Sequence, residues 1–196
     1  MRIGLMGGTF DPIHMGHLLA AQAAREAYPL DQVWFIPSGV PPLKGRNPGA
    51  DSVARLEMTM LATEVEPAFR VLPLEVDRGG VSYSYDTVTE LMERHPQAEF
   101  AYIIGSDRVN DLVKWHRIEE LAAKIRFIGL ARPGDPMTPL EELPAFIASR
   151  LTIARMPQIE LSSTAIRQRV AQGHSIRFMV PESVYSYIQR NGLYES

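Results

Sequence analysis

The stretch Gly-Gly-Thr-Phe-Asp-Pro-Ile-His-Met-Gly-His over residues 7–17 constrains the fold of this 196-residue chain more than any other segment. The apolar run before it, residues 3–6, is typical of a buried strand in a parallel sheet. Asp11 and Pro12 suit the N-cap and first position of a helix, which the small and apolar residues 18–24 continue. The stretch predicts a strand, a glycine turn and a helix start, where backbone amides and the helix dipole attract phosphate.

Two histidines belong to this predicted phosphate site. His14 and His17 are three residues apart, a spacing that places both imidazoles on one helix face, and Gly16 between them leaves the approach open. Imidazoles can donate hydrogen bonds to phosphoryl oxygens while charge moves from the attacking to the leaving group. A histidine pair alone is more often a surface or core feature, with a zinc site as a rarer alternative. The ordered set of strand, glycines, helix start and histidines favours phosphoryl transfer.

The stretch resembles the HxGH signature of the nucleotidyltransferases related to class I aminoacyl-tRNA synthetases. Its longer form, GGTFDPxHxGH, is similar to the bacterial nicotinate mononucleotide adenylyltransferase family. The resemblance continues through ordered motifs to about residue 194 and implies adenylyl transfer from ATP to nicotinate mononucleotide. Pyrophosphate would leave by direct in-line attack, without a covalent enzyme intermediate. In this family the catalytic groups would be His14, His17 and Arg167.

Two further segments resemble the mononucleotide side of this family, and Trp115 belongs to a third, similar to GSDxxxxxxxW, that begins at Gly105. The loop Pro41-Pro42-Leu43-Lys44 has Leu43 where the family usually has His, while Lys44 keeps its place. The segment from Ser82 to Thr87 is similar to Ser-Tyr-Thr-x-Asp-Thr, and Ser84 or Asp86 can cap the helix that follows. The simpler alternatives to mononucleotide binding are that Ser84 or Asp86 only caps the helix and that Trp115 only packs against its neighbours. The resemblance implies that the mononucleotide is bound by Lys44, Ser84, Tyr85, Thr87 and Trp115.

Two other segments resemble the ATP side. The run from Phe100 to Ile104 predicts a strand, after which Gly105-Ser106-Asp107 follows at its carboxyl end. The segment from Leu161 to Arg167 is similar to the motif ISSTxIR and predicts a second helix start with hydroxyls and a guanidinium on one side. A capping motif with a surface arginine is the simpler alternative. The resemblance implies that ATP is bound by Gly7, Gly8, Thr9, Phe10, Gly105, Asp107, Arg132, Ser163 and Thr164.

The remaining patterns predict one α/β domain over residues 1–196, with a C-terminal helical subregion over residues 162–196. Its fold class is a Rossmann-like, doubly wound, mainly parallel sheet with helices on both faces. In the predicted helix 52–64, Val53, Leu56, Met60 and Leu61 lie at helical spacing, with Arg55 on another face. Further strands are expected at 33–36, 69–72, 126–131 and 151–154, further helices at 119–123 and 140–148, a helix started by Pro181 and ended by Gly192 within 180–192, and a turn at 75–80.

Composition limits the partners. A net charge of −3 gives no overall attraction to nucleic acid or to a membrane surface, and the chain contains no cysteine for disulfides or thiolate metal ligands. No apolar run approaches the roughly 20 residues of a membrane span, so a cytoplasmic location is expected. The expected cofactor is Mg²⁺ held mainly by substrate phosphates, and a homo-oligomer is possible.

Two rival functions can be weighed from the sequence. Pantetheine-phosphate adenylyltransferases are shorter and have Thr in place of His14, and cytidylyltransferases lack the segment Ser-Tyr-x-x-Asp-Thr. A nucleotide-sensing module that binds ATP without turnover would not need both histidines together with Arg167.

Overall fold

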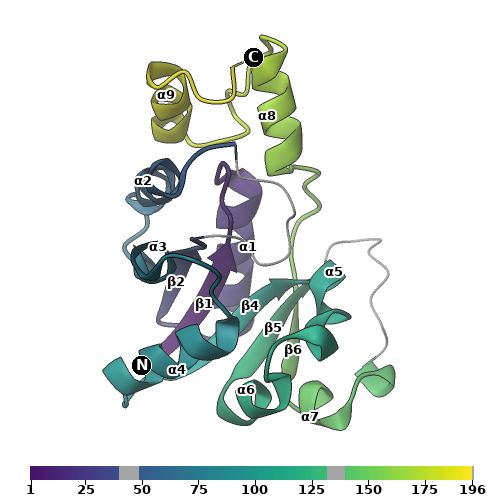
Figure 1. Cartoon of the computed structure of the whole chain (residues 1–196). Helices are drawn as coiled ribbons and strands as arrows, with labels where there is room; N and C mark the ends of the chain where they lie inside the picture. Colours follow the sequence, from purple (N-terminus) through teal and green to yellow (C-terminus); the bar gives the residue numbers. More distant parts are fainter. Residues whose placement is uncertain (40–48, 132–139, 196) are drawn as a thin grey trace. The chain divides into compact units, whose positions relative to one another are not determined.

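The computed structural model describes residues 1–39, 49–131 and 140–195 (Figure 1). In this part of the chain a six-stranded sheet has the order β3-β2-β1-β4-β5-β6. The pairings β1·β4, β4·β5 and β5·β6 are parallel. This architecture confirms the predicted Rossmann-like α/β fold. The strands are β1 (Arg2–Gly8), β2 (Gln32–Pro37), β3 (Phe69–Val71), β4 (Glu99–Gly105), β5 (Arg126–Ala131) and β6 (Leu151–Arg155).

Helices connect these strands. Side-chain caps fix two of them: the carboxylate of Asp51 accepts from the amide of Ala54 at 2.7 Å, and the hydroxyl of Ser162 accepts from the amide of Ala165 at 3.1 Å. The helices are α1 (Met15–Ala27), α2 (Ser52–Thr63), α3 (Leu74–Arg78), α4 (Ser84–Arg94), α5 (Ser106–Val109), α6 (Ile118–Lys124), α7 (Ala145–Ala148), α8 (Ser163–Ala171) and α9 (Glu182–Arg190), with 3-10 turns η1 (Leu112–Lys114) and η2 (Leu140–Glu142).

The described chain divides into two compact units. The first unit comprises residues 1–6, 20–34 and 83–158, and the second comprises residues 7–19, 35–82 and 159–195. Strands β1 and β2 and helix α1 each run from one unit into the other. The expectation of a single domain with a C-terminal helical subregion stays a prediction.

The first unit has its core on strands β1, β4 and β5. Ile3 and Leu5 of β1 and Phe127 of β5 are fully buried, as the apolar runs predict. Gly4 lies among these side chains. A Cβ at this position would come within 2.7 Å of Leu30 and 2.8 Å of Ile103, so the packing leaves no room for a larger residue. On one side of these strands, α6 contacts both α4 and α7 (Figure 1). This unit carries the carboxyl end of β4, where Gly105 and Asp107 were expected to meet ATP.

The second unit packs around α2, which contacts β3, α3 and α9 (Figure 1). The hydroxyl of Ser183 donates to the carbonyl of Leu61 at 3.0 Å, and Tyr187 donates to the carboxylate of Glu57 at 2.6 Å. These bonds join α9 to α2. The helix α9 begins after Pro181, as predicted.

The face that α2 buries differs from the prediction. Val53 and Met60 are 56% and 55% exposed, whereas Arg55, Met58 and Thr59 are buried. Arg55 lies on the inner face because its guanidinium has backbone acceptors there. The expected apolar stripe was therefore assigned to the wrong side of the helix.

Local boundaries also differ from the predictions. The expected turn at 75–80 contains α3, and the expected helix at 140–148 is divided into η2 and α7, with Pro144 as the N-cap of α7. Helix α1 begins at Met15, so Asp11 and Pro12 are not its N-cap and first residue. They lie in a turn with a cis peptide bond between them. In the described residues, none of the helices has the length and apolar character that crossing a membrane requires.

Candidate active site

The two histidines lie together although only one of them is helical. His14 precedes α1 and His17 is its third residue, and their rings stack with centroids 3.7 Å apart and planes at 24°. Backbone bonds hold this geometry, because the amides of His17 and Leu18 both donate to the carbonyl of His14, at 2.9 and 3.4 Å. The predicted juxtaposition of the imidazoles is confirmed, while the prediction that both lie within the helix was wrong.

The orientation of His17 fixes which of its nitrogens can donate. Its Nδ1 accepts a hydrogen bond of 3.2 Å from the backbone amide of His14. In a neutral imidazole the proton is then on Nε2, which makes Nε2–H a hydrogen-bond donor. The ring of Phe10 meets the His17 ring edge-on, with centroids 5.1 Å apart and planes at 86°. His17 is therefore held as a donor whose ring has a defined direction.

Close packing explains two glycines of the stretch. A Cβ at Gly16 would come within 3.0 Å of the His14 ring, so the absence of a side chain there makes room for His14 itself. A Cβ at Gly8 would come within 2.9 Å of the Phe10 ring, which is 3% exposed and also packs against Phe35. The side chain of Phe10 thus supports His17, so only its backbone remains to line a nucleotide.

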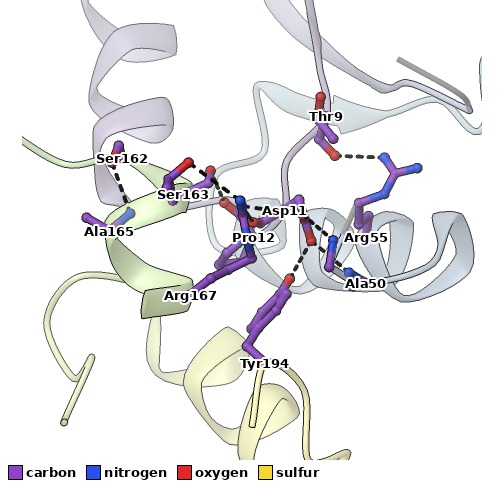
Figure 2. A network of polar contacts seen from close by, with 12 residues as sticks. Thr9, Asp11, Pro12, Ala50, Arg55, Ser162, Ser163, Ala165, Arg167 and Tyr194 are labelled. Carbon is purple, nitrogen blue, oxygen red and sulfur yellow. Dashed lines mark hydrogen bonds and ion pairs between the residues drawn. The ribbon is translucent and has the colours of Figure 1, made fainter. Parts of the chain in front are cut away.

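The carboxylate of Asp11 is the centre of a buried polar network (Figure 2). It accepts from the amides of Gly49 at 2.8 Å and Ala50 at 3.0 Å and from the hydroxyl of Tyr194 at 2.8 Å. The guanidinium of Arg167 lies 3.4 Å from the same carboxylate and donates to the backbone carbonyl of Asp11 at 2.6 Å. These contacts compensate a charge that would otherwise be costly to bury.

The start of α8 lies against the same turn. The hydroxyl of Ser163 donates to the carbonyl of Pro12 at 2.9 Å, and Arg167 donates to the hydroxyl of Thr164 at 3.5 Å (Figure 2). The side chain of Arg167 keeps 31% exposure. The structure therefore brings the predicted residues Ser163, Thr164 and Arg167 together with the stretch that carries the histidines.

Arg55 is a site residue that sequence reasoning missed. Its guanidinium donates to the carbonyls of Thr9 at 2.7 Å and Gly39 at 2.8 Å, and the residue is 1% exposed. Burial lowers the pKa of Arg55, and the nearby negative charge of Asp11 opposes this shift. Arg55 fixes the backbone where the chain leaves β1 and β2. One sequence signal could have indicated this burial: Arg55 lies three residues before the apolar Met58 and so shares a helix face with it.

The first unit holds four of the residues expected to bind the mononucleotide, Ser84, Tyr85, Thr87 and Trp115. The hydroxyl of Ser84 donates to that of Tyr102 at 3.2 Å, and Tyr102 meets Trp115 edge-on with ring centroids 5.3 Å apart. The N-cap of α4 is Tyr83, without a side-chain bond, so the predicted cap by Ser84 or Asp86 was wrong. Ser84 and Trp115 thus belong to one cluster through Tyr102, a residue that the sequence did not single out.

Tyr85 and Thr87, the other residues of α4 that were predicted to bind the mononucleotide, have side chains engaged in other contacts. Arg117 lies over the ring of Tyr85 at 3.8 Å, and the Tyr85 hydroxyl donates to Glu120 at 3.5 Å. Thr87 is fully buried. The first-turn amides of α4 are consequently the groups through which this segment can meet an anion. Gly105 ends β4 and Asp107 lies in α5, whereas Lys44 and Arg132 lie outside the described residues.

Across the described ranges, no group of three or more His, Asp or Glu side chains is placed to bind a metal ion. Asp11, the acidic residue of the stretch 7–17, accepts from two amides and a phenol and pairs with a guanidinium.

Comparisons with known proteins identify the family of this chain. The model of the family described as cytidylyltransferase-like matches residues 5–169. A probable nicotinate-nucleotide adenylyltransferase of Bacillus pumilus (strain SAFR-032) is 44% identical over 195 residues, covering 100% of this chain and 99% of the relative. The corresponding protein of Geobacillus thermodenitrificans (strain NG80-2) is 43% identical over 193 residues, covering 98% of this chain and 86% of the relative. The chain belongs to the nicotinate-nucleotide adenylyltransferases of the cytidylyltransferase-like family.

A solved structure supports the fold of this adenylyltransferase family member. Plasmodium falciparum nicotinic acid mononucleotide adenylyltransferase complexed with NaAD matches with a TM-score of 0.80 at 20% identity, covering 98% of this chain and 97% of that one. At this level of identity the match supports the α/β architecture. The assignment to the family rests on the full-length relatives and on the family model.

Replacing the buried Arg55 is expected to destabilise the fold. Arg55→Met leaves the carbonyls of Thr9 and Gly39 without their donor, which should cost about 2–4 kcal/mol in the free energy of unfolding, measured in urea. Arg55→Lys should recover only part of this loss, because an ammonium lacks the planar fork that reaches both carbonyls. Arg94→Met is the matched control, since Arg94 is 60% exposed and should change stability little. Equal unfolding midpoints for Arg55→Met and wild type would contradict the assigned role.

Two phenols should make stability fall at alkaline pH. Burial, aided by Asp11, raises the pKa of Tyr194, and burial together with Glu57 raises the pKa of Tyr187 to about 12. An unfolded tyrosine ionises near pH 10, so the folded chain keeps protons that the unfolded chain loses above that pH. The stabilisation that these two phenols give the folded state is fully present below about pH 10 and declines above it. For Tyr187 the decline continues up to about pH 12.

Urea unfolding at pH 9 and pH 11 measures this decline. Tyr194→Phe should start less stable but lose less stability between the two pH values. Tyr185→Phe, which keeps the ring under Arg177, should show the wild-type decline. A Tyr194→Phe variant with the wild-type decline would be inconsistent with a half-buried phenol that stays protonated in the folded chain.

Proposed function

We propose that this chain transfers the adenylyl group of ATP to nicotinate mononucleotide, forming nicotinate adenine dinucleotide and pyrophosphate. Its full-length relatives carry the name of this activity. The observation that carries the proposal is the stacked histidine pair, in which the Nδ1 of His17 accepts from the backbone, so that Nε2 carries the proton of the neutral ring. A donor of this kind stabilises a phosphoryl group that gains charge during transfer.

In this proposal a phosphate oxygen of the mononucleotide attacks the α-phosphorus of ATP in line. The bond from the α-phosphorus to the oxygen bridging to the β-phosphorus breaks, and its electron pair leaves with pyrophosphate. His17 donates to the transferring phosphoryl group, and the adjacent His14 contributes to the same site. Arg167, with Ser163 and Thr164 at the start of α8, holds the leaving pyrophosphate. Catalysis then comes from positioning and charge stabilisation, without a nucleophile on the protein.

The two substrates are assigned to different segments. We infer that the backbone of residues 7–10 lines the nucleotide and that Gly105 and Asp107 meet its ribose. The backbone amides of Ser84 and Tyr85 at the start of α4 receive the carboxylate of the mononucleotide, the buried Thr87 supports this turn, and Trp115 stacks on the pyridine ring. Lys44 and Arg132 stay predicted phosphate and nucleotide contacts.

We propose Mg²⁺ as the cofactor, bound mainly by the phosphates of ATP. When bound, Mg²⁺ neutralises charge on the phosphates. Among the described side chains near the histidines, the guanidinium of Arg167 and the hydroxyls of Ser163 and Thr164 would bind phosphate oxygens that the metal leaves uncovered.

The activity is tested by incubating purified protein with ATP, Mg²⁺ and either nicotinate or nicotinamide mononucleotide. Dinucleotide and pyrophosphate are followed by chromatography and a coupled assay. Equimolar formation of both is expected with nicotinate mononucleotide. Absence of product with either acceptor would refute the proposed function.

Removing the donor of His17 should slow turnover. His17→Ala is expected to lower kcat by about 10²–10³, the range for losing one transition-state donor. The exposed His174 gives the control His174→Ala, which should keep wild-type kcat. Near-normal turnover of His17→Ala would contradict the role assigned to His17.

Trp115 should affect only one substrate. Trp115→Ala is expected to raise KM for the mononucleotide roughly five- to tenfold, because a stacking contact is worth on the order of 1 kcal/mol, with KM for ATP little changed. Trp115→Phe, which keeps an aromatic face beside Tyr102, should restore most of the affinity. If Trp115→Ala weakened both substrates equally, the residue would have a packing role instead.

A further inference from the structure

Tyr194 has a backbone conformation that is unusual for a bulky residue. Its φ is +67°, in the left-handed region that side chains rarely adopt, and its hydroxyl donates to the Asp11 carboxylate at 2.8 Å. Backbone strain of this kind persists only where surrounding contacts hold it. Burial and the charge of Asp11 raise the pKa of Tyr194, so at neutral pH the phenol is a permanent donor.

The Asp11 carboxylate has a second, competing partner. Arg167 lies 3.4 Å from the oxygen of Asp11 that also accepts the Gly49 amide, while Tyr194 shares the other oxygen with the Ala50 amide. Each neutral donor on the carboxylate reduces the negative charge that Arg167 experiences. A phosphate that binds Arg167 must compete with Asp11 for the same guanidinium, so the donors on Asp11 set the strength of that competition.

Packing couples Tyr194 to Arg167 a second time. A Cβ added at Gly49 would come within 3.0 Å of the Tyr194 ring and 2.9 Å of the Cδ of Arg167. The ring of Tyr194 and the aliphatic stem of Arg167 thus both pack closely against Gly49. Figure 2 shows Tyr194 and Arg167 converging on Asp11 from different segments.

We propose that Tyr194 is a positioning residue which, by satisfying Asp11, leaves Arg167 available to the phosphates of ATP and to pyrophosphate. This inference rests on the proposed function, in which Arg167 holds the leaving pyrophosphate. Tyr194 itself does not touch the substrate. Loss of its hydroxyl leaves Asp11 to bind Arg167 more strongly, at the expense of the phosphate ligand.

The variant Tyr194→Phe tests this role because it keeps the ring and removes only the donor. Steady-state kinetics should show KM for ATP raised about fivefold to tenfold, at the lower end of couplings between linked sites, with KM for the mononucleotide within about twofold of wild type. Calorimetric titration with pyrophosphate should show Kd raised by the same factor. Tyr187→Phe is the matched control: it removes a phenol bonded to a different carboxylate, Glu57, and should leave both constants unchanged.

A double-mutant cycle separates positioning from general support of the fold. In an Arg167→Met background, which keeps the stem beside Gly49, Tyr194→Phe should cause no further loss of pyrophosphate affinity. A further loss in that background, an unchanged KM for ATP in Tyr194→Phe, or an equal rise of both KM values would overturn the proposal. Wild-type protein that forms no dinucleotide would instead refute the proposed function, while the pyrophosphate titrations would still decide the role of Tyr194. Thermal melts of each variant verify that the compared proteins are folded.

Discussion

The conformation of the histidine-bearing stretch depends on the buried carboxylate of Asp11. A carboxylate that is 4% exposed is stable only when its oxygens are hydrogen-bonded or paired with a cation. Asp11 meets this requirement with the amides of Gly49 and Ala50, the phenol of Tyr194 and the guanidinium of Arg167. One charge thereby holds three distant segments against the turn between β1 and α1, and the histidines follow directly from that turn.

The strands could be predicted from the sequence because buried parallel strands are short apolar runs bounded by glycine, proline and polar residues. Helix boundaries were less predictable. An Asp-Pro pair before an apolar stripe fits an N-cap on local evidence, yet Asp11 bonds amides 38 and 39 residues away, and α1 begins only at Met15. A long-range bond to the carboxylate displaced the local one that the sequence favoured.

The site was predictable where its residues share a local motif. His14 with His17, and Ser163 with Arg167, are close in the chain, so a helix or turn is enough to bring them together. Arg55 and Tyr194 were missed because their partners lie 46 and 183 residues away, and a charged residue in a helix usually faces solvent. For Lys44 and Arg132, which lie outside the described residues, the sequence remains the only guide.

Local charge explains how a chain with a net charge of −3 can bind a polyphosphate. Two guanidiniums, Arg55 and Arg167, lie near the carboxylate of Asp11, and Asp51 adds a second negative charge near Arg55, so cationic groups are concentrated here although the whole chain carries a net negative charge. The hydrogen bonds that Arg55 donates to Thr9 and Gly39 go to backbone carbonyls, which do not cancel its charge. A carboxylate in place of these carbonyls would also hold Arg55, but it would neutralise the charge of the guanidinium. Neutral acceptors for Arg55 therefore fix the backbone and also preserve the charge that the proposed binding of phosphates would use.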